Sequence, residues 1–317
     1  MTLLISGGVQ PGGDPRRLRE PRLLALDPLS GAVNTVLALG SGPRCAGGDH
    51  QELTAGFVRD GALWVGTRSE VLCVGLADGS VRTRWGHPLL YDVHSVAPGA
   101  QGELLISATG HDSVLRMSEG GELLEHHWLR RGRFWDAYPG INKDFSGIPF
   151  DRFKPHAHHP NRAFLHQGSP WVTLFEQRRC EALGGDRVIE LPEGPPHDGL
   201  LREGLLWFTT VTGVVVAVDP VSLERRLTLD LAALDRTPGL QGWCRGIEVV
   251  GSRLFVGMTA LRSTTHREVL RRVLRGAAGR KRPSRVVEID LDQRRVVREW
   301  PVFGAAGGGT IFGLYWV

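Results

Sequence analysis

Histidines recur at one type of position in this sequence, at or directly before the start of a short apolar run. They occur in the phrases GGDHQE (His50), YDVHSV (His94), KPHAHHPNRAF (His156, His158 and His159) and PPHDGL (His197). Neutral imidazole is the commonest protein ligand for metal ions, and sites built only from histidine suit Fe(II), Zn or Cu. If these positions meet in the folded chain, the pattern predicts a mononuclear centre for one divalent transition metal, with iron favoured.

The separation between each histidine and its apolar run ranks the candidate ligands. His94 and His197 fit directly, whereas in the third phrase His159 is favoured over its neighbour His158. His50 is the weakest candidate because HQELTAGFV places extra residues before its apolar run. Carboxylates that could accept the second ring N–H, and so fix the tautomer, stand near three of these histidines; they are Asp49, Asp92 and Asp198.

A fifth phrase of the same kind, GWCRGIEVV, carries arginine and glutamate where the others carry histidine. Arg245 could hold a carboxylate or phosphate in fork geometry, and Glu248 could act as a general acid or base. The alternative for this pair is an Arg–Glu ion pair inside a channel. The alternative for the histidines is that they only line such a channel or cap strand ends. Cys244 is interpreted as an inert buried thiol.

The elements that must position these residues are short strands. An apolar run, a turn and a second apolar run recur as GFVRDGALWVGT, HSVAPGAQGELLISATG, RAFLHQGSPWVTLF, GLLREGLLWFTTVTG and GIEVVGSRLFVGMTA. Short β-branched and aromatic runs separated by Gly and charged turn residues are typical of antiparallel strands. The starts of these phrases lie roughly 40 to 65 residues apart, and a four-stranded propeller blade needs about 40 to 45, so the phrases predict five blades.

The two ends of the chain supply a sixth blade. The sequence closes with GGGTIFGLYWV and opens with MTLLISGG, RLLALDPLSG and AVNTVLAL, which we interpret as one inner strand and three outer strands. Pairing the N- and C-terminal strands in one blade closes the ring and leaves no long sheet edge open. We therefore expect an all-β, six-bladed β-propeller that forms a single domain over residues 1–317. Its innermost strands would bring the histidine positions together at one mouth.

The composition agrees with such a fold and indicates the cellular compartment. The 317 residues include 42 Gly and 19 Pro, as many tight turns require. The four Cys occur singly, which indicates neither a disulfide framework nor a zinc ribbon. The N-terminus lacks a basic segment followed by a long apolar run, and no stretch approaches the length of a membrane span. We expect a cytoplasmic protein without a membrane span.

Two segments are longer than a four-stranded blade requires, and we interpret them as insertions. Residues 125–156 are rich in aromatic side chains, including Trp135 and Tyr138, and lead directly into the third histidine phrase. We expect this insertion to cover the mouth as a substrate lid, with a cover over a blade edge as the alternative.

The other insertion, residues 262–285, is a basic arm with nine Lys or Arg and one Glu, so it outweighs the net charge of +4 of the whole chain. A contact with an anionic partner is one interpretation and a solvated excursion is the other. No aromatic residues interleave with these charges, so nucleic acid is not expected.

The phrases GWCRGIEVVGSRLFVGMTALRS, HPNRAFL and HDGLLREGLLWF resemble a bacterial β-propeller family of largely unknown function. The resemblance implies a fold and no particular reaction. Gluconolactonase-like propellers hold their axial cation with Glu, Asn and Asp, unlike the imidazoles here. Carotenoid-cleaving oxygenases place four histidines around an axial iron on seven blades, and the likeness to them is one of site only.

These observations favour a metal-dependent enzyme. The metal would lie on the axis, Arg245 would orient an anionic group and Glu248 would move a proton. The substrate would be a small organic or peptide-derived molecule, and oxygenase, lyase, isomerase and hydrolase chemistry all stay open. The alternative is a non-catalytic propeller that binds a partner protein or an anionic ligand at its mouth or on the basic arm.

Overall fold

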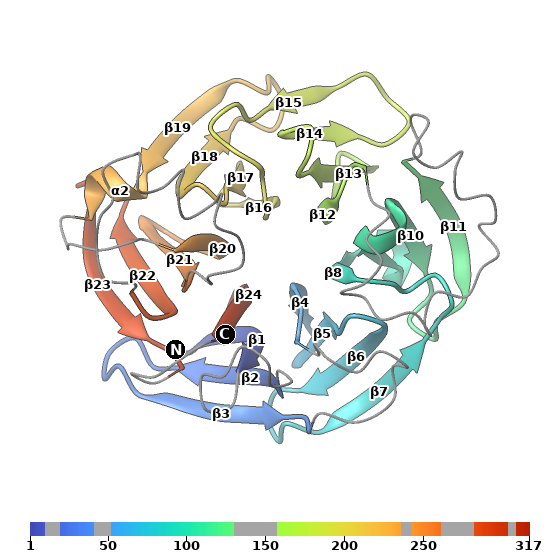
Figure 1. Ribbon diagram of the computed structural model, residues 1–317, viewed down its shortest axis with the longest axis horizontal. Helices are drawn as coiled ribbons and strands as arrows, with labels where there is room; N and C mark the ends of the chain where they lie inside the picture. The colour runs from blue at the N-terminus through green and yellow to red at the C-terminus, as the bar shows by residue number, and fades with distance from the viewer. Residues whose placement is uncertain (10–19, 41–51, 130–156, 236–241, 261–281, 304–308) are drawn as a thin grey trace, which may run out of the picture.

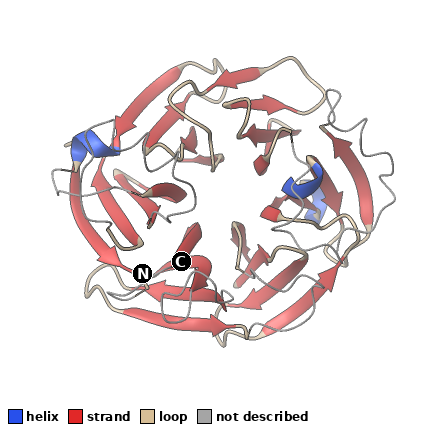
Figure 2. Ribbon diagram, viewed as in Figure 1, coloured by secondary structure: helices blue, strands red, loops and turns tan. Residues whose placement is uncertain are grey.

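The computed structural model is a ring of six four-stranded antiparallel sheets around a central axis (Figure 1). It describes residues 1–9, 20–40, 52–129, 157–235, 242–260, 282–303 and 309–317. Strands account for nearly all the regular structure (Figure 2). The expected all-β, six-bladed propeller is confirmed.

We number the blades I to VI along the chain. Blade I comprises β24 (Gly309–Trp316), β1 (Leu3–Val9), β2 (Glu20–Leu26) and β3 (Val33–Ala38). Blade II comprises β4 (Gly56–Arg59), β5 (Ala62–Gly66), β6 (Glu70–Gly75) and β7 (Val81–Gly86). Blade III comprises β8 (Val93–Pro98), β9 (Leu104–Ala108), β10 (Ser113–Met117) and β11 (Leu123–Trp128).

The other three blades have the same order from the axis outward. Blade IV comprises β12 (Pro160–His166), β13 (Ser169–Leu174), β14 (Arg179–Ala182) and β15 (Val188–Glu190). Blade V comprises β16 (Leu200–Arg202), β17 (Leu205–Thr209), β18 (Val214–Val218) and β19 (Arg225–Asp230). Blade VI comprises β20 (Trp243–Val250), β21 (Arg253–Thr259), β22 (Arg285–Asp290) and β23 (Arg295–Pro301).

Helical structure in the described part of the chain is limited to short turns. These are η2 (Ala100–Gly102), η3 (Thr109–His111) and α2 (Leu231–Leu234), the last of which begins at an Asp230 cap that accepts the N–H of Ala232. Among the described residues, no helix has the length and apolar character that crossing a membrane requires.

The turns explain why the repeated phrases fold as hairpins. In VRDGAL the two central residues, Asp60 and Gly61, have φ angles of 50° and 67°. Glu203 and Gly204 in LREGLL have φ angles of 45° and 73°. Two successive residues with positive φ form the turn whose twist matches that of the flanking strands. Each such turn joins the innermost strand of a blade to its second strand.

Burial follows the position of a strand in its blade. Every residue of β5 and of β9 is buried, whereas the outermost strand β7 alternates between exposed and half-buried residues. The inner strands are buried on both faces because each blade packs between two others. Trp64 of blade II and Leu115 of blade III, for example, belong to one apolar cluster. Continuous apolar runs are the expected sequence of strands that have no solvent face.

The chain ends close the ring as expected. β1 pairs with β24 in antiparallel register, so the N- and C-terminal strands share blade I. Thr2 and Val317 exchange two backbone hydrogen bonds of 2.9 Å beyond the end of that pairing. The edge that an open ring would present at blade I is therefore paired.

Candidate functional site

The six innermost strands, β4, β8, β12, β16, β20 and β24, surround the axis (Figure 1). Each blade contributes one residue to a group near the start of these strands. We call this group the axial cluster: Phe312 from blade I, Arg68 from blade II, His94 from blade III, His159 from blade IV, His197 from blade V and Arg245 from blade VI.

The ring of Phe312 lies at the centre of the axial cluster and is fully buried. Its centroid lies 5.9 Å from the ring centroid of His94 and 5.6 Å from that of His197. The guanidinium carbons of Arg68 and Arg245 lie 5.4 Å and 5.1 Å from the same centroid. The face of an aromatic ring attracts cations, so Phe312 helps two arginines to approach the axis.

Hydrogen bonds fix the tautomer of His94. The side-chain amide of Asn161 donates to the carbonyl of Pro196 over 2.8 Å, so its oxygen faces the Nδ1 atom of His94 at 2.6 Å. Nδ1 must therefore carry the proton. Burial lowers the pKa of His94, and the neutral ring presents its Nε2 lone pair to Arg68 Nη1 at 3.0 Å.

Arg68 is held by two carboxylates beside His94. Its guanidinium pairs with Glu52 at 3.1 Å and with Asp92. Burial opposes the charge, but the two carboxylates outweigh burial and raise the pKa of Arg68. Asp92, which the sequence suggested as a partner of His94, lies 3.4 Å from its Nε2 atom while also binding Arg68.

His197 differs from His94 in lacking partners. Its side chain is 2% exposed, and neither ring nitrogen has a hydrogen-bond partner in the described part of the chain. The nearest carboxylate oxygen, from Asp198, lies 3.7 Å from Nδ1, which is too far for a hydrogen bond. Asp198 instead accepts hydrogen bonds from Thr209 and from the backbone N–H of Gly246. Burial and the nearby charge of Arg245 lower the pKa of His197 to about 4.

Asp112 separates His158 from His159. Its carboxylate accepts the backbone N–H groups of Ala157, His158 and His159. The His158 ring stays beside Asp112, with Nδ1 at 3.4 Å. His159 has a positive φ of 54°, and its ring centroid lies 5.0 Å from that of His94. His159, the favoured member of the pair, therefore belongs to the axial cluster.

Arg245 and Glu248 lie apart. Arg245 stacks on Trp243 at 4.8 Å and reaches Phe312, whereas Glu248 accepts a 2.8 Å hydrogen bond from Arg202. A strand advances about 3.3 Å per residue, so three residues along β20 place Glu248 about 10 Å further from the mouth. Within the described residues the structure shows no contact between Glu248 and the axial cluster, and the expected alternative of an Arg245–Glu248 ion pair is not formed.

Several predicted site residues lie outside the described residues. They are His50, Asp49, Trp135 and Tyr138. Of the predicted aromatic lid, residues 125–128 form the end of the outermost strand β11. Of the predicted basic arm, Arg282 and Arg285 are described and form ion pairs with Asp235 and Glu299.

The described residues do not form a complete set of metal ligands. Among these residues there is no group of three or more His, Cys, Asp or Glu side chains placed to hold a metal ion. Both ring nitrogens of His94 are engaged, by Asn161 and Arg68. Both ring nitrogens of His197 lack a hydrogen-bond partner among the described residues. A metal ion on His94 would therefore require Arg68 to leave Nε2.

Sequence reasoning missed Arg68 and Asn161. Arg68 lies in the turn between β5 and β6, and such a turn returns to the end of the blade where the innermost strand begins. Asn161 lies within the third histidine phrase, but its role depends on His94 and Pro196 from two other blades. Phe312 lies at the centre of the cluster.

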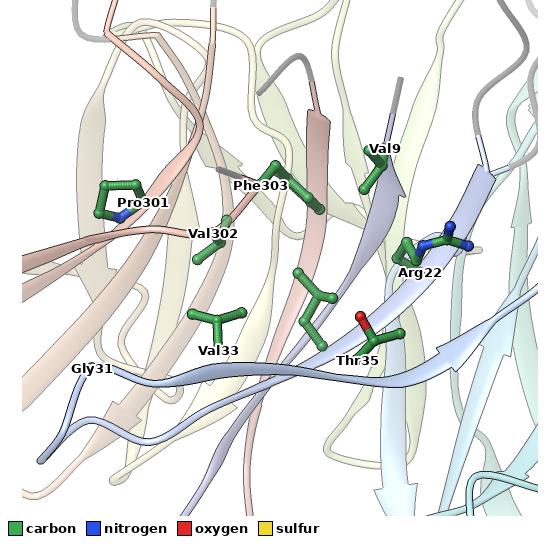
Figure 3. A pocket seen from close by; sticks show the side chains of 9 residues that line it. Val9, Arg22, Gly31, Val33, Thr35, Pro301, Val302 and Phe303 are labelled. Atoms are coloured by element: carbon green, nitrogen blue, oxygen red, sulfur yellow. The ribbon is translucent and has the colours of Figure 1, made fainter. Parts of the chain in front are cut away.

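A surface pocket of about 470 Å³ lies away from the axial cluster, between β2, β3 and the segment after β23 (Figure 3). The residues that line it include Val9, Val33, Val302 and Phe303, with Arg22 at one side. Arg22 pairs with Glu20.

Comparison with known proteins supports the fold alone. No family model and no curated protein matches the chain. A protein of unknown function from Bacteroides caccae is 13% identical, with a TM-score of 0.63 over 99% of this chain and 98% of that one. A chain of a nidogen/laminin complex is 10% identical, with a TM-score of 0.60 over 99% and 98%. Virginiamycin B lyase from Staphylococcus aureus, solved with quinupristin as a catalytically inactive histidine-to-alanine variant, is 16% identical, with a TM-score of 0.50 over 84% and 74%.

Proposed function

We propose that the protein is an enzyme and that the axial cluster is its active site, with His197 as the proton acceptor. The observation that carries this proposal is the buried His197 ring with two partnerless nitrogens. A buried polar atom without a partner costs free energy, and active sites are where such groups are kept. The substrate is a small organic or peptide-derived molecule with an anionic group.

The charges around His197 suggest how substrate binding prepares the base. A base with a pKa of about 4 is weak at neutral pH, and Arg245 is the second cause of that low pKa after burial. An anionic group of the substrate beside Arg245 offsets its positive charge. The pKa of His197 then rises toward neutrality only when the substrate is bound.

Proton abstraction by His197 suits an elimination reaction. A lyase removes a proton from carbon while a leaving group departs, so one positioned base and one anion-binding group serve the reaction. The loss of activity in a histidine-to-alanine variant of virginiamycin B lyase supports this choice, because it indicates that a propeller can support histidine-dependent lyase chemistry.

The metal-dependent form of the proposal gives His197 a different role. Its partnerless nitrogens are suitable ligands for Fe, Cu or Zn, and a bound ion would supply a Lewis acid. His159 is the other cluster histidine that could serve as a ligand without displacing Arg68 from His94. The same experiment distinguishes the two forms.

The test compares wild type with His197→Ala in a complex mixture of small metabolites, followed by mass spectrometry. We expect wild type to consume at least one anionic compound and His197→Ala to leave it unchanged. His166→Ala is the matched control, because His166 is also buried but its Nε2 contacts the carbonyl of Pro220, away from the axis. Aliquots treated with a chelator, then supplied with iron, copper or zinc, test the metal.

Turnover that survives His197→Ala, or no turnover by wild type with or without added metal, contradicts the proposal. Turnover that the chelator abolishes and one metal restores supports the metal-dependent form. Turnover that is indifferent to the chelator supports His197 as a simple base.

A further inference from the structure

Arg162 reaches across the channel below the axial cluster. It belongs to β12 of blade IV, yet its Nη2 atom donates a 3.0 Å hydrogen bond to the carbonyl of Gly56 on β4 of blade II. Blade III lies between these two blades along the ring (Figure 1). The guanidinium group is therefore inside the channel, and part of the side chain remains exposed.

The charge of Arg162 has no carboxylate partner. Among the described residues, no carboxylate oxygen lies within ion-pair distance of this guanidinium. Its Nε atom is buried and has no hydrogen-bond partner. Burial is the main cause that lowers the pKa of Arg162, but arginine keeps its charge at neutral pH. The channel therefore holds a cation that the described carboxylates do not pair.

The two carboxylates whose charges reach Arg162 are engaged elsewhere. Asp198 accepts hydrogen bonds from Thr209 and Gly246, and Glu248 accepts one from Arg202. Their charges act on Arg162 from a distance, and neither carboxylate contacts it.

The tyrosine beside Arg162 is neutral and its hydroxyl is also occupied. Tyr315 accepts the N–H of Gly56 at 2.6 Å and contacts Ser6 at 2.9 Å. Since Ser6 donates its only hydroxyl proton to the carbonyl of Thr54, Tyr315 must donate to Ser6. The channel wall on this side offers Arg162 no negative charge.

We propose that Arg162 is an anion-binding residue of the channel and that the site binds a carboxylate. A charged group removed from bulk water requires a counter-charge, and one that the chain does not supply is available to a ligand. A guanidinium matches a planar carboxylate with two parallel hydrogen bonds, whereas a spherical ion uses only its charge. The inference does not depend on any chemistry at His197.

The probe is sodium acetate, titrated into the full-length protein while thermal unfolding is followed. Ionic strength is held constant with a bulky buffer anion, so that only the small anion changes. A ligand that binds only the folded state raises the melting temperature as its concentration passes the dissociation constant. We expect a rise of several degrees for wild type and no acetate-dependent rise for Arg162→Gln.

Three variants make the result specific. Arg253→Gln, which removes an exposed guanidinium that pairs with Glu288, should respond like wild type. Arg162→Lys retains the charge without the fork, so it should keep a reduced response even if Arg162→Gln folds poorly. His197→Gln should keep the full response, which separates this site from the axial cluster.

Other anions identify which kind of negative group the site prefers. Sodium chloride that matches acetate in its effect would overturn the assignment of a carboxylate, as would a stronger effect of inorganic phosphate. Butyrate or succinate that acts at lower concentration than acetate would support the carboxyl group of a larger ligand as the natural occupant. An acetate response retained in Arg162→Gln, or absent in wild type, would overturn the site itself.

Discussion

His197 and His94 show how the surroundings of a residue decide its chemistry. Both rings are buried at the axis, and burial lowers the pKa of each. His94 is bonded at both nitrogens, whereas His197 has no partner at either in the described part of the chain. His94 therefore serves as an acceptor for Arg68, whereas the described part of the chain leaves both ring nitrogens of His197 without a hydrogen bond.

At the residue scale, the lowered pKa of His197 predicts that the stability of the protein depends on pH. The unfolded chain binds a proton near pH 6.5, but the folded ring does so only near pH 4. Between these values the unfolded state holds more protons than the folded state. The contribution of His197 to the free energy of unfolding is therefore complete above pH 6.5 and is lost as the pH falls to 4. The loss is about 3 kcal/mol.

Urea unfolding of wild type and His197→Gln from pH 4 to pH 7 measures this contribution. We expect the free energy of unfolding to fall less steeply with decreasing pH in the variant. His166→Gln should retain the slope of wild type. Parallel slopes for wild type and His197→Gln would contradict the assignment.

At the scale of elements, two polar contacts set the geometry of the mouth. Asp112, in the turn after η3 of blade III, accepts three consecutive backbone N–H groups that lead into β12 of blade IV. Tyr315 joins β24 of blade I to β4 of blade II through Gly56 and Ser6. In each case a side chain of one blade fixes the start of an inner strand in another.

Asp112→Ala should shift His159 away from the axis. Three N–H groups lose their acceptor, and each buried unpaired donor costs about 1–3 kcal/mol before relaxation. We expect a net loss of about 3 kcal/mol in the free energy of unfolding, measured with urea. Asp112→Asn retains one acceptor oxygen and should lose less. Equal stability of the alanine variant and wild type would show that the contacts do not hold the segment.

Tyr315→Phe should weaken the seam between blades I and II by about 1–3 kcal/mol, because the N–H of Gly56 loses its partner. Ser6→Ala removes the other half of the same relay. The double variant should lose less than the two single losses together, since the relay is already broken. Additive losses in a urea-unfolding cycle would mean that Tyr315 and Ser6 act separately.

At the scale of the whole molecule, closure of the ring is a pairing between the chain ends. Thr2 and Val317 are joined by two backbone hydrogen bonds. We therefore expect the fold not to depend on where in the ring the chain ends lie. New chain ends could be placed at any exposed hairpin turn, provided that the present ends are joined.

A circular permutant tests this property. Val317 is linked to Met1 by a short Gly-Ser segment, and new ends are placed at the Glu203–Gly204 turn, which is exposed. We expect its melting temperature to lie within a few degrees of wild type. A chain that lacks residues 1–9 loses β1 and should not unfold cooperatively, because β24 and β2 no longer meet. A stable truncated chain would contradict ring closure through β1.

The fold was predictable from the sequence because each blade carries its own local signals. The runs GFVRDGALWVGT and GLLREGLLWFTT contain their strands, and the Asp60–Gly61 and Glu203–Gly204 turns contain the residues that tolerate positive φ. The convergence of His94, His159 and His197 was predictable for the same reason, since they lie at or just before the start of equivalent strands.

The partners of those histidines were decided only by the tertiary structure. Arg68 reaches His94 from another blade, Asn161 is oriented by Pro196, and Arg162 crosses to Gly56. Sequence spacing fixes which end of a strand a residue occupies, because the backbone repeat is regular. It does not fix which side chains of separate blades come within about 3 Å, because that distance depends on the packing of the whole ring.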